Sequence, residues 1–231
     1  MLHWQPVFAG DQIRFIDGDS YYHMRRVLLA LRNNMHVPEY DPYMNFPSGM
    51  LCRWPPLFDQ IIAGLAWLIG LGSPSDKLAE TIGAFLPPVM GAITSIVVFF
   101  AVRCIMNSWI SLMASVCFTI LPYPIQISVV GRADHHVAVE LIASLLMLVI
   151  FSFGQAKTIK EILSKAVVAG ILFAAIMLLW TGSSLFFLIL LFWLLLSIIL
   201  AECRRQAEWS DFIVVCGVIL YTIALICIIP F

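Results

Sequence analysis

The sequence predicts an all-α polytopic membrane protein, and the evidence is its composition, its hydropathy and the spacing of its apolar runs. Hydrophobic residues fill 61% of the 231 positions, charged residues only 12%, and the mean hydropathy is +0.96. A soluble domain carries about 25% charged residues. Basic residues number 13 against 14 acidic ones, and no basic face interleaved with aromatics occurs, so we expect membrane lipid and no nucleic acid among its partners.

Six apolar stretches are long enough, or nearly so, to cross a bilayer as helices. They cover residues 80–104, 108–130, 137–154, 163–181, 184–200 and 212–230. Crossing the hydrocarbon core takes about 20 apolar residues, and the shorter stretches suit spans that pack mostly against protein. Residues 78–231 are therefore predicted to form a transmembrane bundle of about six helices.

Residues 1–77 are more polar and predict a large external loop with amphipathic or interfacial helices. One helix is expected over 19–34, where Asp19 or Ser20 can cap the N-terminus. Another is expected over 56–72, but its uninterrupted apolar run is eleven residues. Such a run covers about 16 Å as a helix, whereas a bilayer core measures about 30 Å. This helix should therefore lie at the membrane surface or re-enter it.

Basic residues near the span ends predict the orientation, because short cytoplasmic loops are enriched in lysine and arginine. One set of span ends carries Arg103, Lys157, Lys160, Lys165, Arg204 and Arg205, whereas the short connections at the other ends hold only Lys77 and Arg132. The first set is expected in the cytoplasm. If 56–72 does not span, residues 1–77 and the turn 131–136 share the outer face.

Two acidic segments would then meet on one side of the membrane: "DGDSYYHMR" at 17–25 and "GRADHH" at 131–136. Each has an ordinary explanation, because Asp-Gly-Asp can cap a helix or form a turn and Asp-His-His can be a solvated turn. A short connection between two spans that is rich in ionisable residues nevertheless favours a functional site.

The residue types in these segments suit a divalent cation. Asp19 and Asp134 offer hard oxygen ligands and His136 offers an imidazole, a mixture that favours Mn²⁺ or Mg²⁺ over a thiolate-bound structural zinc. Arg132 and His135 beside them can hold an anion such as phosphate. A cation next to a phosphate-binding arginine suggests a pyrophosphate leaving group, with the metal acting as a Lewis acid.

Four motifs stand in the order and rough spacing typical of one enzyme family: "DSYYHMRRV", "YDPYMNFPSG", "RWPPLFDQIIAGLA" and "GRADHHVAVE". The chain resembles the catalytic subunit of oligosaccharyltransferase, a membrane glycosyltransferase of the GT-C type, and its "DHH" resembles the archaeal and bacterial branches. The resemblance implies metal-dependent, inverting transfer of an oligosaccharide from a polyprenyl or dolichyl (pyro)phosphate donor. The acceptor would be the asparagine of an Asn-X-Ser/Thr sequon in a polypeptide.

The resemblance also implies roles for single residues in catalysis and metal binding. Asp19 matches the aspartate that binds the metal and contacts the acceptor amide, and Asp134 with His136 matches the second metal-binding motif. We therefore expect Asp19 and Asp134 to be catalytic, and Asp19, Asp134 and His136 to hold the Mn²⁺ or Mg²⁺.

A second set of residues is expected to meet the lipid-linked donor. His135 is similar to a phosphate-contacting histidine, Arg53 is placed like a basic residue that meets the lipid phosphate, and Trp180 matches a tryptophan close to the donor. The family commonly has an arginine four residues before the motif glycine, where this chain has Ile127. Arg132 is the candidate to supply that charge.

The resemblance also implies parts that these 231 residues do not contain: a span before Asp19, further spans, an external catalytic glutamate and a soluble domain with a Trp-Trp-Asp signature. We therefore expect an N- and C-terminally truncated fragment that is inactive alone. Its expected place is the prokaryotic plasma membrane, with the active site on the external, periplasmic face. The alternatives are another GT-C enzyme such as a protein O-mannosyltransferase, a divalent-cation transporter and a non-catalytic membrane remnant.

Overall fold

The computed structural model describes residues 4–10 and 12–186, and single helical residues between 188 and 224. Its elements are α1 (Gly18–Arg32), β1 (Tyr40–Asp41), β2 (Met50–Leu51), α2 (Leu57–Ile69), α3 (Asp76–Arg103), α4 (Ser108–Ile120), α5 (Pro122–Ile127), α6 (His136–Ser152), η1 (Phe153–Gln155), α7 (Ile159–Leu179) and η2 (Thr181–Ser183). Among the described residues, α3, α6 extended by η1, and α7 are long and apolar enough to cross a membrane. The expected spans 184–200 and 212–230 lie largely outside the described residues.

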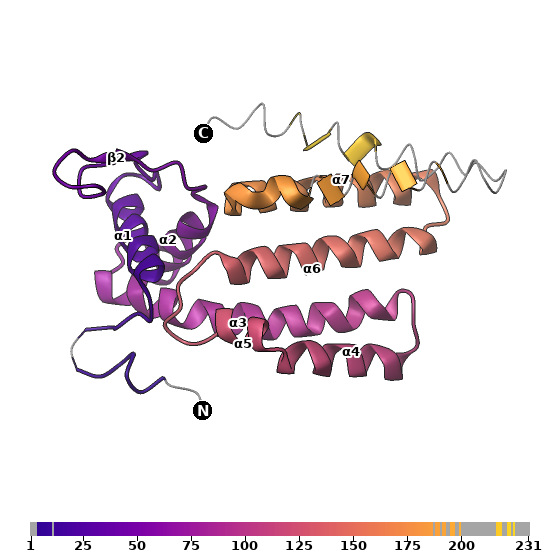
Figure 1. Cartoon of the computed structure of the whole chain (residues 1–231), viewed down its shortest axis with the longest axis horizontal. Coiled ribbons are helices and arrows are strands. Elements are labelled where there is room, and N and C mark those ends of the chain that lie inside the picture. Colours follow the sequence, from indigo (N-terminus) through magenta and orange to yellow (C-terminus); the bar gives the residue numbers. More distant parts are fainter. Residues whose placement is uncertain are drawn as a thin grey trace.

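The long helices form a bundle that carries a smaller cap at one end. In Figure 1, α3, α4, α6 and α7 lie side by side, while α1, α2 and the hairpin of β1 and β2 stand at one end of them. Within the bundle, α3 packs against both α4 and α6, and α6 packs against α7. The cap rests on α3 and α7, with α1 packed on α2. The turn between α5 and α6 lies at this capped end of the bundle.

Helix α1 begins one residue earlier than the sequence suggests, because its cap is Asp17 and neither Asp19 nor Ser20. The Asp17 Oδ1 accepts hydrogen bonds from the backbone nitrogen of Ser20 at 2.9 Å and from its hydroxyl at 2.6 Å. An N-cap side chain satisfies a backbone N–H two or three residues further on. Asp19 is thereby left free of capping, exposed in the first turn of α1.

Helix α2 is the short apolar helix that the sequence places between the polar segment and the first span. Its 13 residues cover about 20 Å at 1.5 Å per residue, and it is not among the described candidates for a membrane span. One face, with Phe58, Ile62 and Ala66, is fully buried, whereas Leu68 and Ile69 are exposed. An apolar helix that buries one face against α1 and exposes the other suits a membrane surface.

The stretch 108–130 does not form the single helix that was expected. Helix α4 ends at Ile120, Leu121 adopts an extended conformation with ψ of 140°, and α5 starts at Pro122. A proline disfavours the helical conformation of the residue before it and is itself well tolerated in the first turn. Pro122 therefore breaks the helix and sends the chain towards the capped end.

Gly131 anchors the turn after α5 to two other parts of the chain. Its φ of +85° lies in the left-handed region that favours glycine. Its N–H donates to the Ala84 carbonyl of α3 at 3.0 Å, and its carbonyl accepts from the Ile16 N–H at 3.1 Å. A Cβ at this position would also meet the Val7 side chain at 2.8 Å. The turn is thus held between α3 and the segment that leads into α1.

The packing of α1 on α2 generates a matched pair of stability predictions. Replacing the fully buried Ile62 by alanine should lower the free energy of unfolding by about 2–5 kcal/mol, because the change leaves a cavity between the helices. Replacing Ile69, which is 61% exposed on the same helix, by alanine should change the free energy of unfolding by no more than about 0.5 kcal/mol. Denaturant titration in mixed micelles measures both, and equal losses would contradict the packing described.

Candidate functional site

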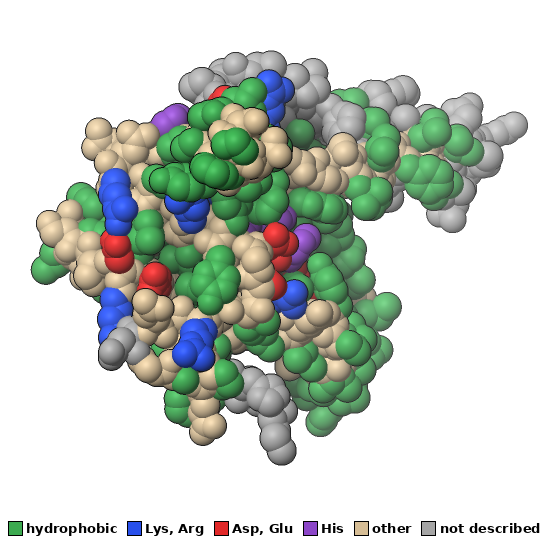
Figure 2. Space-filling view, turned by 60° about the vertical axis from the view of Figure 1, so that its left-hand side comes forward, with side chains coloured by type: hydrophobic (Ala, Val, Ile, Leu, Met, Phe, Trp, Pro, Cys, Tyr) green, Lys and Arg blue, Asp and Glu red, His purple; other side chains and the backbone are tan. Residues whose placement is uncertain are grey.

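The turn 131–135 lies beneath the first turns of α1, and ionisable side chains from both segments meet there. His23 of α1 contacts His135, and Asp17 at the start of α1 pairs with Arg132. Figure 2 shows acidic, basic and histidine side chains close together right of the centre of this face, with further charged side chains spread over its left-hand part. The two acidic segments therefore meet on one side of the bundle, as the sequence predicts.

One side of the Asp134 carboxylate faces two histidines. Its Oδ1 lies 2.9 Å from His135 Nδ1 and 3.9 Å from His23 Nε2, and the two ring nitrogens are 3.1 Å apart. These three atoms all lie within 4.8 Å of one another, a grouping that could hold a metal ion. His23 and Asp134 are buried, so this side of the carboxylate is turned into the protein.

The other side of the Asp134 carboxylate faces the remaining predicted ligands. Its Oδ2 lies 4.0 Å from Nε2 of His136, the first residue of α6. Asp19, exposed in the first turn of α1, lies close enough for its charge to act on His136. The Trp180 ring lies edge-on to the His136 ring at 6.2 Å. The structure thus brings Asp134, His136 and Trp180 together, with Asp19 nearby.

The histidines keep Asp134 ionised despite its burial. Desolvation by itself would raise the pKa of this carboxyl, but the hydrogen bond from His135 and the electrostatic interactions with His135, His136 and His23 outweigh it and lower the pKa to about 2. A buried carboxylate stabilised by neighbouring donors is a common feature of sites that use its charge. Asp134 therefore presents a full negative charge at neutral pH.

His23 is held from behind by α2. Its Nδ1 lies 2.6 Å from Asp59 Oδ1, and the Asp59 Oδ2 lies 3.2 Å from Arg26 Nε. The Arg26 Nη2 in turn donates to the Trp54 carbonyl at 2.8 Å. All three ionisable residues of this set are almost fully buried. A continuous chain of polar contacts therefore runs from α2 through α1 to the turn 131–135.

Arg132 is engaged with the start of α1. Its Nε lies 3.0 Å from Asp17 Oδ2, and its Nη1 donates to the Gln126 carbonyl at 3.1 Å. Ile127, which stands where the family commonly has arginine, is buried in α5. The guanidinium of Arg132 thus lies beside the site, and its contact with Asp17 joins the two acidic segments.

Arg53 is exposed, and within the part of the chain that the structure describes it shares no hydrogen bond or ion pair with the cluster around Asp134. Its neighbour Trp54 does reach this cluster, with ring centroids 5.4 Å from His23 and 6.4 Å from His135. The segment before α2 therefore borders the site through Trp54.

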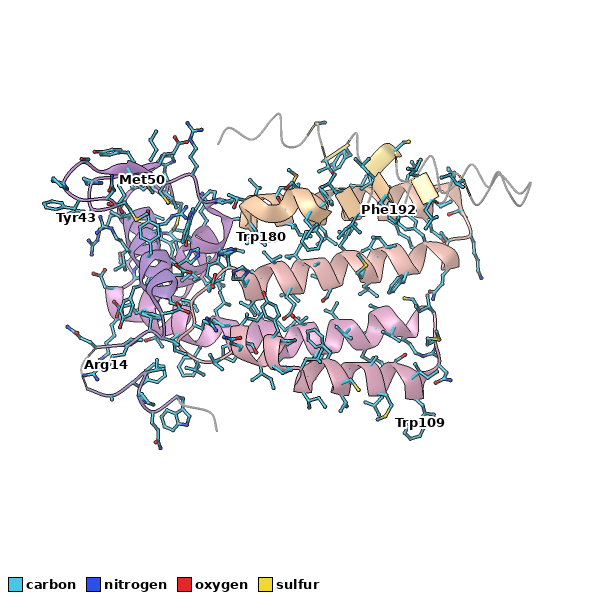
Figure 3. All side chains as sticks on the ribbon, in the orientation of Figure 1. Arg14, Tyr43, Met50, Trp109, Trp180 and Phe192 are labelled. Carbon is cyan, nitrogen blue, oxygen red and sulfur yellow. The ribbon has the colours of Figure 1, made fainter. Side chains whose placement is uncertain are left out.

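An apolar cavity of about 620 Å³ opens next to the cluster and runs along α6. His136, Glu140 and Trp180 line it together with apolar side chains from α3, α4 and α6, among them Ala101 and Phe151. In Figure 3, Trp180 stands at the end of α7 that faces the cap. The cavity thus joins the charged cluster to the membrane-embedded part of the bundle.

Sequence reasoning left four residues of the site without a role: Asp17, His23, Arg26 and Asp59. A signal for His23 was present, because it follows Asp19 by four residues and therefore lies one turn further along α1. Asp59 carried no comparable signal, since 36 residues separate it from His23 and only the packing of α2 on α1 joins them.

The arrangement fits a divalent cation. His135 Nε2 is buried without a hydrogen-bond partner among the described residues, and the donor set combines carboxylate oxygens with imidazole nitrogens. Fold and site together define a class: a helical membrane protein with a carboxylate–histidine cluster at one end of its bundle. The family follows from comparison: residues 3–231 match the model of the N-terminal part of the oligosaccharyl transferase STT3, and the chain belongs to that family.

The chain is similar to archaeal relatives. It is 30% identical over 175 residues to dolichyl-phosphooligosaccharide-protein glycotransferase 1 of Archaeoglobus fulgidus, a match that covers 75% of this chain and 27% of the relative. The fold matches the crystal structure of the Archaeoglobus fulgidus oligosaccharyltransferase with Zn and sulfate at a TM-score of 0.79 and 21% identity, over 94% of this chain and 28% of that one. The chain thus spans little more than a quarter of these proteins.

The same fold is found in the archaeal oligosaccharyltransferase AglB from Archaeoglobus fulgidus in complex with an inhibitory peptide and a dolichol-phosphate. The TM-score is 0.78 at 19% identity, over 94% of this chain and 26% of that one. These structures confirm the prediction of a helical membrane protein with the fold of this family.

The ion pair between Asp17 and Arg132 should stabilise the junction of the two acidic segments. In a double-mutant cycle with Asp17→Ala and Arg132→Ala, we expect a coupling of about 1 kcal/mol in the free energy of unfolding, since both side chains are partly shielded from water. Denaturant titration of the four proteins measures it. Strictly additive losses would show that the pair does not join the segments.

Proposed function

We propose that this chain forms part of an oligosaccharyltransferase that transfers an oligosaccharide from a polyprenyl or dolichyl (pyro)phosphate to the asparagine of an Asn-X-Ser/Thr sequon. The observation that carries the proposal is the ionised Asp134 flanked by three histidines at the meeting point of the two acidic segments, in a chain of the STT3 family. The bundle is then of the GT-C type, and residues 1–77 form its first external loop.

The chemical difficulty of the reaction is the poor nucleophile, because the lone pair of an amide nitrogen is delocalised. Asp19 is exposed at the start of α1, and its carboxylate can accept an N–H bond of the acceptor amide and reduce that delocalisation. The amide nitrogen then bonds to the anomeric carbon from the face opposite the phosphate. The carbon–oxygen bond breaks and its electron pair stays on the leaving phosphate, while one amide proton passes to the Asp19 carboxylate and from there to solvent.

We assign the cation to Asp19, Asp134 and His136. The support is that Asp134 Oδ2 faces His136 Nε2 and that the charge of Asp19 reaches His136, whereas Asp134 Oδ1 is engaged by His135 and His23. When bound, Mn²⁺ or Mg²⁺ would act as a Lewis acid that stabilises the charge on the departing phosphate oxygen.

The remaining polar groups suit the lipid-linked donor. His135 Nε2 is buried and unpartnered among the described residues, and we assign it to the phosphate, with Arg132 and Arg53 as further positive charges. Trp180 and the apolar cavity along α6 suit the sugar-proximal part of a polyprenyl chain. Glu140 lines the same cavity, and no role in transfer is assigned to it.

We place the protein in a prokaryotic plasma membrane with this site on the external face. Lys157 lies just before α7, Lys160 lies in the first turn of α7, and Arg103 ends α3, which puts these charges at the ends opposite the site. Short connections with basic residues favour the cytoplasmic side.

Replacing Asp134 by alanine in the full-length protein should abolish transfer, because both the cation and His135 lose their shared partner. The assay is transfer of a lipid-linked oligosaccharide to a fluorescent Asn-X-Thr peptide. His36→Ala is the matched control, since His36 is exposed beyond the other end of α1 and should retain activity. Normal transfer by Asp134→Ala would overturn the assignment of the site.

Chelation of divalent cations should stop transfer, and Mn²⁺ or Mg²⁺ should restore it. In His136→Ala the cation concentration for half-maximal activity should rise about tenfold or more, the effect expected for loss of one metal ligand or its close partner. His36→Ala should titrate like the wild type. An unchanged midpoint in His136→Ala would remove His136 from the proposed ligands.

A further inference from the structure

We propose that His23 and Asp59 are positioning residues for the donor site: they fix the imidazole of His135 so that its Nε2 faces the phosphate of the lipid donor. This inference rests on the proposed function. Neither residue touches the reacting groups, and both act through His135.

The hydrogen positions in the contacts that lead from Arg26 through Asp59 and His23 to His135 can be assigned by starting from Arg26. Arg26 always donates, and the carboxylate of Asp59, whose Oδ2 lies 3.2 Å from Arg26 Nε, only accepts. Asp59 Oδ1 therefore receives the hydrogen of His23 Nδ1, from which it is 2.6 Å away. In a neutral imidazole the second nitrogen is then an acceptor, so His23 presents a lone pair on Nε2.

The same reasoning fixes the ring of His135. Its Nδ1 lies 3.1 Å from His23 Nε2 and 2.9 Å from Asp134 Oδ1. Both neighbours are acceptors, so Nδ1 carries a hydrogen and donates it. Nε2 is then the ring nitrogen that remains for a ligand, and it is buried without a hydrogen-bond partner among the described residues. A flipped ring would lose both contacts of Nδ1.

Packing holds His23 itself in place. The side chain is 1% exposed, Phe58 meets its ring edge-on at 5.2 Å, and Trp54 lies 5.4 Å away. Phe58 belongs to α2, and Trp54 lies three residues before its first residue. The packing and the Asp59 carboxylate therefore come from α2 and the segment that leads into it. Buried charges are costly to desolvate and give little net stability. Asp59 and Arg26 contact His23, which in turn contacts His135. Their position is therefore consistent with a role in orienting the His135 ring.

Two substitutions of His23 separate a positioning role from a structural one. In His23→Asn the side-chain amide reaches the place of Nδ1 and can keep the bond to Asp59, but it does not reach His135. In His23→Gln the amide reaches the place of Nε2, where its oxygen can accept from His135 Nδ1, while the bond to Asp59 is lost. Arg25→Gln is the control, because Arg25 lies two residues after His23 on α1 and its ion pair, with Asp41 at 2.9 Å, does not involve the cluster.

The measurements use the full-length protein in detergent with saturating Mn²⁺, a dolichyl-phosphate-linked oligosaccharide and a fluorescent Asn-X-Thr peptide. For His23→Asn we expect the KM for the lipid donor to rise about tenfold, the effect of a poorly oriented hydrogen bond to a charged ligand, with the peptide KM within about twofold of the wild type. For His23→Gln and Arg25→Gln we expect a donor KM within about threefold of the wild type.

The opposite pattern, a normal donor KM in His23→Asn and a raised one in His23→Gln, would show that His23 matters only as the partner of Asp59. If His23→Asn does not fold, His23→Gln decides alone: a donor KM more than about threefold above the wild type overturns the role. A wild-type protein that transfers no glycan overturns the proposed function itself, which is a separate result.

A double-mutant cycle tests whether His23 acts through His135. In a His135→Ala background, His23→Asn should change the donor KM by less than about twofold, because the group that it orients is already missing. The same tenfold rise in both backgrounds would overturn the positioning role.

Discussion

The buried contact between His23 and His135 is the interaction on which the site depends. It is the point where α1 meets the turn 131–135, at a distance of 3.1 Å between ring nitrogens. On one side it continues to Asp59 and Arg26, and on the other to Asp134. Each side chain of this chain contacts the next one. Polar contacts of this kind, shielded from water, make the relative position of the two segments specific.

The bilayer explains why this network sits where it does. Inside the hydrocarbon core, backbone polar groups must be paired within a helix and charged side chains are costly. The described candidate spans therefore carry few ionisable residues. The charged cluster lies where α1 meets the turn 131–135, at the end of the bundle that α1 and α2 cap (Figure 1). Helix α2, too short for a span, covers this end and supplies Asp59. The cap thus provides a water-shielded environment for charges without burying them in lipid.

Much of the site was readable from local sequence. Asp134, His135 and His136 stand in a short connection between apolar runs, and Asp19 opens a helix, so their residue types alone indicated a cation and a phosphate. The break of α4 at Leu121 was readable in principle, because Pro122 and Pro124 follow it, but hydropathy alone merges 108–130 into one stretch. His23 was within a quoted motif, yet nothing in the motif says which face of α1 turns towards the bundle.

The sequence by itself determined the membrane class, the short apolar helix α2 and the residue types of the site, because apolar runs, prolines and clustered charges act over a few residues. Only the tertiary structure decided that Asp134 divides its two oxygens between different histidines, that Arg132 pairs with Asp17, and that Asp59 stands behind His23. These pairings depend on distances of a few ångströms between segments far apart in the chain. Such distances are set by how α1 and α2 pack over the turn 131–135.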